Sequence, residues 1–251
     1  MSDVESVHTD PIRILFVGGC HTSGCSLGED HGFPMRIGEE LAKVGVRVDV
    51  RILPHTKLSH RHRILAKCQK ERPQILVMQL GHPELTSGIE DYLRQLCGLP
   101  KTRKAQTPDF PVDRPFLFHL KSCFKALLNH VLCHPLTDLA RVEQLWRVLL
   151  SDVERLRIPE VLVLSPLPCA DRATMYYRRR GLSLFRDLAT EYRCRFLDVL
   201  TDAPQGRVRN FGPNQYHFDG MHLADGGQTA IGRAVANDLR VVVTSLERCL
   251  S

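Results

Sequence analysis

The chain has 251 residues, 43% of them hydrophobic, nine cysteines and a formal net charge of +6. Its length and apolar content predict a globular chain with a large core, and its apolar runs are shorter than the ~20 residues of a membrane span. The N-terminus is polar and has no secretory signal, and the odd number of cysteines includes no CxxC pair, so we expect reduced thiols and a cytoplasmic location. The net charge is modest, and the sequence contains no nucleic-acid reader motif.

The first predicted element is a buried strand over residues 12–17, an apolar, β-rich run with one polar interruption. Gly18 and Gly19 end the strand, and two glycines allow the backbone to turn sharply. Cys20 follows, so a nucleophilic side chain lies at the carboxyl end of a strand, where open α/β sheets place their ligands. A free cysteine is also often an inert core residue, and this segment alone leaves both interpretations open.

Strands and helices alternate along the rest of the chain. Further strands are expected at residues 46–53, 74–80, 161–164 and 195–199. Helices are expected at residues 33–44, 89–96 and 175–192, in a long segment capped by Thr137 or Asp138, and after a capping pair of Asp225 and Gln228. Five strands separated by helices, with no internal repeat, predict a single three-layer α/β domain over residues 1–251.

Two stretches carry many basic residues. The one between Arg51 and Arg72 predicts a solvated helix face. The other is a lid or insert around residues 98–135, which begins with a Pro-, Lys- and Arg-rich loop. Within it, residues 116–133 have apolar residues at helical spacing with lysines among them. This pattern is typical of an amphipathic helix that contacts a lipid or acyl chain at a membrane surface, or of a helix that packs on the domain.

Asp219 and His222 lie three residues apart, just ahead of the last predicted helix. An Asp-x-x-His turn can present a carboxylate and an imidazole to one place. There the carboxylate fixes the ring tautomer and stabilises the imidazolium, as in nucleophile–base–acid triads. An isolated DxxH is a weak signal of catalysis.

Two blocks at opposite ends of the chain together resemble the SGNH, or GDSL-like, hydrolase superfamily. VGGCHTSGCSLGEDHGFP is similar to the family's first block, a Gly-Asp-Ser with a later Gly and a Phe-Pro that opens the next helix. FDGMHLADGGQTAIG is similar to its last block, Asp-Gly-x-His-Leu followed by a Gly and the closing helix. The resemblance covers nearly the whole chain. It implies a flavodoxin-like parallel five-stranded sheet with Cys20, Asp219 and His222 gathered above it as catalytic residues.

The chain also departs from the family's pattern. Cys20 stands where the family has its serine nucleophile, and Gly19 stands where it has the neighbouring aspartate. The third block, ordinarily Gly-x-Asn-Asp, reads Gly-His-Pro-Glu at residues 81–84, and Pro83 has no donor to replace the oxyanion-binding asparagine. The candidates for substrate and oxyanion contacts are Gly19, His21, Gly81 and His82.

The sequence favours a hydrolase or acyltransferase that acts on a small-molecule acyl ester or thioester, which includes carrier-bound acyl groups, with a Cys-His-Asp triad and no cofactor. The alternative is a catalytically inactive SGNH-like protein that binds an acyl or glycan ligand, which the missing oxyanion donors favour. A third hypothesis, a metal or redox site at Cys20, His21 and Cys25, lacks standard ligand spacing, and no metal is expected. Neither nucleic acid nor a transmembrane segment is expected, and peripheral membrane contact stays open.

Overall fold

The computed structural model of the chain describes residues 10–25, 27–28, 31–86, 120, 122–127, 138–169, 171–199, 217 and 222–250, with only the backbone of residues 247–250. Its centre is a five-stranded sheet in the order β2-β1-β3-β4-β5, in which every neighbouring pair is parallel. The strands are β1 (Ile12–Gly18), β2 (Val48–Leu53), β3 (Ile75–Gln79), β4 (Glu160–Leu164) and β5 (Arg195–Leu197). The five predicted strands are confirmed, with ends that shift by one or two residues.

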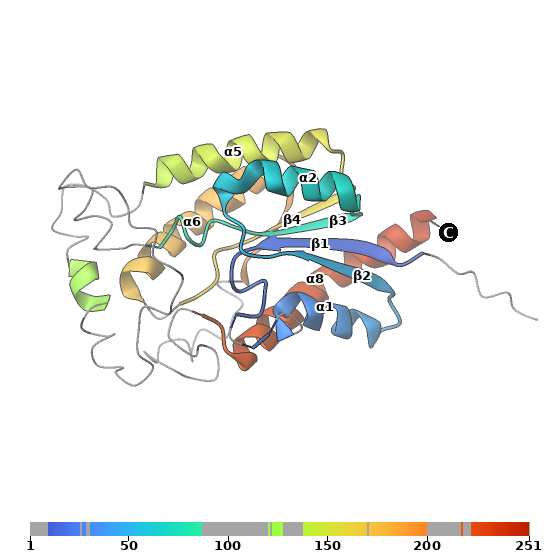
Figure 1. Ribbon diagram of the computed structural model, residues 1–251, viewed down its shortest axis with the longest axis horizontal. Coiled ribbons are helices and arrows are strands. Elements are labelled where there is room, and N and C mark those ends of the chain that lie inside the picture. The colour runs from blue at the N-terminus through green and yellow to red at the C-terminus, as the bar shows by residue number, and fades with distance from the viewer. Residues whose placement is uncertain are drawn as a thin grey trace, which may run out of the picture.

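Helices cover both faces of the sheet, which confirms the three-layer α/β architecture (Figure 1). One face packs against α1 (Phe33–Ala42) and α8 (Asp225–Leu250). The other packs against α2 (Arg61–Glu71), α5 (Leu139–Arg155) and α6 (Arg172–Glu191), with the short 3₁₀ helix η2 (Leu58–His60) ahead of α2.

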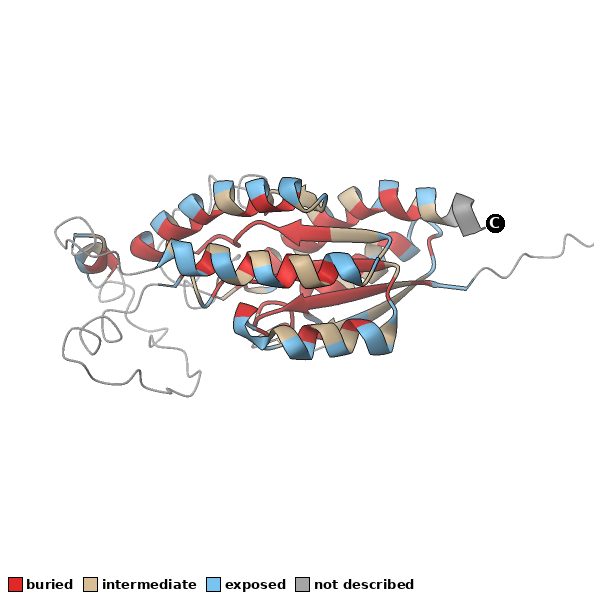
Figure 2. Ribbon diagram, turned by 90° about the horizontal axis from the view of Figure 1, so that it is seen from above, coloured by how far each residue is buried: buried red, intermediate tan, exposed pale blue. Residues whose placement is uncertain are grey.

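Successive side chains of the sheet enter the two cores in turn, because side chains alternate across a strand. In β1, Ile14 and Phe16 belong to the core beneath α1 and α8, whereas Leu15 and Val17 belong to the core beneath α2, α5 and α6. The central strands are therefore buried on both faces, and each helix buries one side and exposes the other (Figure 2). The apolar runs without alternation reflect this double coverage.

Aspartates set the starts of two long helices. Asp138 caps α5 by accepting a hydrogen bond from Arg141 N at 3.0 Å, which settles the choice between Thr137 and Asp138. Asp171 caps α6 by accepting from Thr174 N at 2.8 Å, so this helix begins earlier than the predicted 175. The expected capping pair at the start of α8 is wrong for Gln228. Its side chain is fully buried and bonds to other segments instead of the helix start.

The basic stretch between Arg51 and Arg72 contains α2, of which Ile64 and Cys68 are buried. Its basic residues are mostly exposed, as a solvated helix face requires. The predicted helix over residues 89–96 and the loop over 98–114 lie outside the described residues.

Part of the predicted amphipathic helix is described, as residue 120 and residues 122–127. It contacts the start of α6 through polar groups: Ser122 Oγ accepts from Arg172 N at 2.7 Å, and Lys125 Nζ donates to Asp171 Oδ2 at 3.3 Å. Its apolar side chains are the exposed ones, Leu120, Phe124 and Leu127. Among the described helices, none combines the length and hydropathy that a bilayer span requires.

Candidate active site

The turn after β1 is built on a glycine that has no room for a side chain. A Cβ at Gly18 would lie 1.9 Å from Thr22 Oγ1, while its carbonyl accepts from Thr56 N at 2.8 Å. Cys20 opens the turn, because its carbonyl accepts from Ser23 Oγ at 2.8 Å and from Cys25 N at 3.1 Å. The structure places Cys20 half-buried at the carboxyl end of β1, as the sequence predicts.

The first and last blocks of the sequence meet at His21, about 200 positions from its partners. Leu223 N donates to His21 Nδ1 at 3.4 Å, and Gln228 Nε2 donates to the His21 carbonyl at 3.2 Å. Gln228 also accepts from Phe33 N at 2.9 Å, so this one side chain holds the turn after β1, α1 and α8 together. The ring of His222, which is half-buried, lies 5.6 Å from the His21 ring between centroids.

A second set of hydrogen bonds joins the ends of β3 and β4 to this turn. Leu167 N donates to His82 Nε2 at 2.8 Å, and the Leu167 carbonyl accepts from Arg178 Nη1 at 2.6 Å. Gln79 Nε2 lies 2.5 Å from Nδ1 and 3.2 Å from Nε2 of the same ring, and Thr22 Oγ1 lies 3.2 Å from Gln79 Oε1. The His82 ring is also 5.3 Å from that of His21.

These contacts determine where the ring hydrogens lie. A backbone N–H can only donate, so His82 Nε2 and His21 Nδ1 are acceptors, and the hydrogens sit on His82 Nδ1 and His21 Nε2.

Both rings are neutral because of their surroundings. Burial is the main cause that lowers the pKa of His21 well below 6.5, followed by the charges of His222, Arg178 and His217. Burial likewise lowers the pKa of His82 well below 6.5, followed by Arg178 and His21. Among the described residues, the interior beside the turn therefore contains the neutral imidazoles of His21 and His82 and the guanidinium of Arg178.

The third block also contains a glycine that has no room for a side chain. Gly81 has φ +86°, and a Cβ there would lie 2.6 Å from Phe185 Cζ, so it packs tightly against α6. Pro83 is exposed in the turn that follows. Gly19 differs from both, because a Cβ there would have no described atom within 4 Å. Asp219 lies outside the described residues.

Two groups at this edge were not found from the sequence as members of a network, Gln79 and Arg178. Gln79 is the one polar residue in the apolar run of β3, and that interruption is a usable signal. Arg178 belongs to three consecutive arginines on α6, of which only Arg178 is buried. Without knowing which helix face points inward, the sequence does not distinguish it from Arg179 and Arg180.

A metal site at Cys20, His21 and Cys25 was one of the hypotheses from the sequence. In the described parts of the chain, no three His, Cys, Asp or Glu side chains are placed to hold a metal ion. The expected absence of a metal at Cys20, His21 and Cys25 therefore stays a prediction for the chain as a whole.

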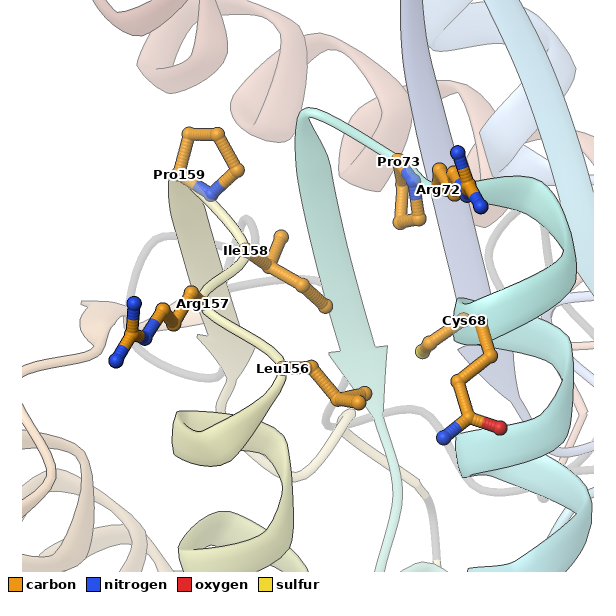
Figure 3. A pocket seen from close by; sticks show the side chains of 8 residues that line it. Cys68, Arg72, Pro73, Leu156, Arg157, Ile158 and Pro159 are labelled. Atoms are coloured by element: carbon orange, nitrogen blue, oxygen red, sulfur yellow. The ribbon is translucent and has the colours of Figure 1, made fainter.

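A hollow of about 460 Å³ lies at the opposite edge of the sheet, beside the amino ends of β3 and β4 (Figure 3). It is lined by Cys68, Gln69, Arg72, Pro73, Leu156, Arg157, Ile158 and Pro159. Burial raises the pKa of the Cys68 thiol to about 12, so this thiol is not a nucleophile near neutral pH. The guanidinium of Arg157 extends away from the hollow (Figure 3). We therefore place the candidate reactive site at the carboxyl edge of the sheet and not at this hollow.

The fold matches those of solved ester hydrolases. A family 3 carbohydrate esterase from Clostridium thermocellum superposes with a TM-score of 0.59 at 11% identity, covering 94% of this chain and 99% of that one. A lipase/acylhydrolase from Enterococcus faecalis gives a TM-score of 0.58 at 12% identity, covering 91% and 95%. A protein of the G-D-S-L family from Desulfitobacterium hafniense gives 0.54 at 13% identity, covering 90% and 98%.

No protein-family model matches the sequence, and no curated protein matches it. At these identities the likeness concerns the fold, which is that of the SGNH, or GDSL-like, hydrolases. The family resemblance noted in the two sequence blocks is thereby confirmed at the level of architecture.

Proposed function

We propose that this chain, which has the fold of an ester hydrolase, is an acyl-ester or thioester hydrolase or acyltransferase with Cys20 as nucleophile, His222 as general base and Asp219 as the residue that orients His222. The observation that carries this proposal is the meeting of the first and last blocks at the carboxyl edge of the sheet. His21 is the chain neighbour of Cys20 and the ring neighbour of His222 at 5.6 Å. Both proposed reactive side chains are half-buried, which leaves them accessible to a substrate.

The proposed reaction has two steps. His222 takes the proton of the Cys20 thiol, and the thiolate attacks the acyl carbon to give a tetrahedral intermediate. The intermediate collapses to an acyl-thioester on Cys20, and the leaving alkoxide or thiolate receives the proton from His222. Water or another acceptor, deprotonated by His222, then attacks the acyl carbon and releases Cys20.

Stabilisation of the oxyanion needs donors other than Pro83. The backbone N–H of Cys20 is one proposed donor. Of the two histidine candidates, His21 suits the second position better, because its Nδ1 is engaged by Leu223 N and its Nε2 carries the hydrogen. His82 has both ring nitrogens committed to Leu167 and Gln79. His82 is therefore a structural residue in this proposal.

Initial rates on p-nitrophenyl acetate and on a short acyl thioester test the proposal. We expect Cys20→Ala to abolish turnover and His222→Ala to lower it by roughly 10²–10⁴-fold, the usual contribution of a general base. Cys25→Ala is the matched control, since Cys25 is a half-buried thiol in the same turn, and it should leave the rates unchanged. Turnover that survives in Cys20→Ala would refute the assignment.

A binding protein without catalysis is the second candidate, and the exposed Pro83 is the observation that favours it. Loss of one oxyanion donor costs ~10²–10³-fold in rate. In this case, all variants would show the same background rate as the buffer, while an acyl ligand would still raise the thermal stability of the unmodified chain.

A further inference from the structure

Arg178 is a buried cation in α6. Its side chain is among the largest that are fully buried, with 2% of the residue exposed, whereas Arg179 and Arg180 are exposed. Burial of a guanidinium costs free energy unless an anion or a full set of acceptors compensates for it. The partners of Arg178 therefore decide whether its position is explained by the fold alone.

Among the described residues, the guanidinium of Arg178 has acceptors for only part of its hydrogen-bond donors. Nη1 donates to the Leu167 carbonyl at 2.6 Å. Nε is buried without an acceptor, and neither a hydrogen bond from Nη2 nor a carboxylate in ion-pair range occurs among the residues that the structure describes. Nε and Nη2 form the edge of a guanidinium that binds a carboxylate or phosphate with two parallel hydrogen bonds. That edge is the part of Arg178 left open.

None of the described groups near Arg178 supplies the missing negative charge. Asp171, which also lies near Cys169, is committed to Lys125 Nζ at 3.3 Å and to Thr174 N at 2.8 Å. The other described titratable neighbours are the Cys169 thiol, whose pKa is raised by burial, and the neutral rings of His21 and His82, and none of these is a counter-ion. Among the described residues, the open edge thus belongs to a cation without a counter-ion, near His21 and His82.

We propose that Arg178 binds an anionic group of the ligand, a carboxylate or a phosphate, on its Nε–Nη2 edge. The inference rests on the proposed function for its location, because the ligand is the acyl substrate or the acyl acceptor of the site at Cys20. An oxyanion there satisfies the buried Nε and neutralises the guanidinium. The substrate class narrows accordingly to esters or thioesters that carry a second, anionic group.

Binding is tested without catalysis, in the Cys20→Ala background. Inorganic phosphate and succinate are titrated separately, with chloride at equal ionic strength, while thermal unfolding and heat of binding are recorded. We expect saturable stabilisation by at least one of them, and which one distinguishes a phosphate from a carboxylate ligand. The Kd should rise at least roughly tenfold in Arg178→Lys, which keeps the charge but loses the two parallel donors of the guanidinium. The stabilisation by the anion should vanish in Arg178→Gln.

Arg179→Gln is the matched control and should bind as the parent does. No saturable effect of either anion, or an equal effect in Arg178→Lys and Arg178→Gln, would overturn the proposal. If Arg178→Gln fails to fold, the Kd of Arg178→Lys decides, and an unchanged value counts against it.

A kinetic arm uses the active chain and two matched esters, p-nitrophenyl butyrate and the mono-p-nitrophenyl ester of succinate. We expect a kcat/KM preference of at least tenfold for the charged ester, lost through KM in Arg178→Lys. Absence of turnover for both esters would count against the proposed function, and the binding arm would still decide on Arg178. Turnover without a preference would contradict the assignment of Arg178.

Discussion

Adjacent glycines at the end of β1 have different physical roles. A Cβ at Gly18 would meet Thr22 Oγ1 at 1.9 Å and the Gln79 carbonyl at 3.0 Å, so Gly18 allows the contact between the turn and β3. A Cβ at Gly19 would meet no described atom within 4 Å. In the SGNH superfamily that the sequence resembles, aspartate stands at this position. Among the described atoms, Gly18 is thus the glycine without room for a side chain, whereas Gly19 has that room.

Alanine at the two positions should separate these roles. Gly18→Ala forces Thr22 to move and should lower the free energy of unfolding by roughly 1–3 kcal/mol, the cost of overpacking. Gly19→Ala should change it by less than about 0.5 kcal/mol. Urea unfolding of both variants measures this, and equal losses would show that the space beside Gly19 is filled.

Pro83 is the residue at which the chain departs furthest from the resembling family. Its ring carries no donor, and it lies exposed in the turn after β3. Asparagine there restores a donor beside the proposed site, so Pro83→Asn should raise the rate on unactivated oxygen esters more than on thioesters, whose better leaving groups depend less on the oxyanion hole. Matched oxygen-ester and thioester rates measure this. Efficient and equal turnover of both by the unmodified chain would mean that another donor already acts.

At the scale of elements, the site depends on how α8 docks. Arg36 of α1 donates to Thr229 Oγ1 at 2.6 Å and contacts Asp225, while Gln228 reaches Phe33 and the turn after β1. These bonds position the segment that carries His222 relative to Cys20. The long helix at the C-terminal end of the described chain therefore acts on the site through its first turn.

Removal of the Gln228 amide should be costly. Gln228→Ala leaves Phe33 N without a partner and leaves the His21 carbonyl with Gly24 N alone, at 3.3 Å, and a buried unsatisfied group costs about 1–3 kcal/mol. Gln69→Ala, an exposed glutamine on α2, is the matched control and should be nearly neutral. Chemical denaturation compares the two. A small effect of Gln228→Ala would mean that water takes the place of Gln228 at Phe33 N.

On the scale of the whole molecule, stability should depend on pH through the buried histidines. The folded state disfavours protonation of His21 and His82, whose pKa values lie below 6.5, whereas the unfolded chain takes up protons near 6.5. The stability that these two neutral rings contribute is therefore complete above pH 6.5. It is lost as the pH falls below 6.5 toward their pKa values in the folded state.

His82→Gln should reduce this acid-side slope by up to about 1.4 kcal/mol per pH unit, because one titrating ring is removed. His62→Gln, at an exposed position of α2, is the control and should keep the slope of the parent chain. Free energies of unfolding from pH 7.5 down to 5 test the prediction. Identical slopes for all three chains would contradict the neutral state of His82.

The sequence predicted the architecture because its signals are local or repeat along the chain. The doubly buried strands appear as apolar runs, and the two blocks at Cys20 and His222 are recognisable as patterns. The network around His82, by contrast, depends on long-range contacts, of His82 with Leu167 and of Gln79 with Thr22, which no local pattern encodes. Arg178 was missed for the same reason, because its burial depends on how α6 packs against the sheet.

The most direct test of the central claim is a covalent one. The unmodified chain is mixed with a short acyl thioester or p-nitrophenyl acetate, quenched in acid within the first turnovers, and analysed by intact mass and peptide mapping. We predict the addition of one acyl group on the peptide that contains Cys20, its absence in Cys20→Ala and slower formation in His222→Ala. An acyl group on a different cysteine, or one that still forms in Cys20→Ala, would contradict Cys20 as the nucleophile.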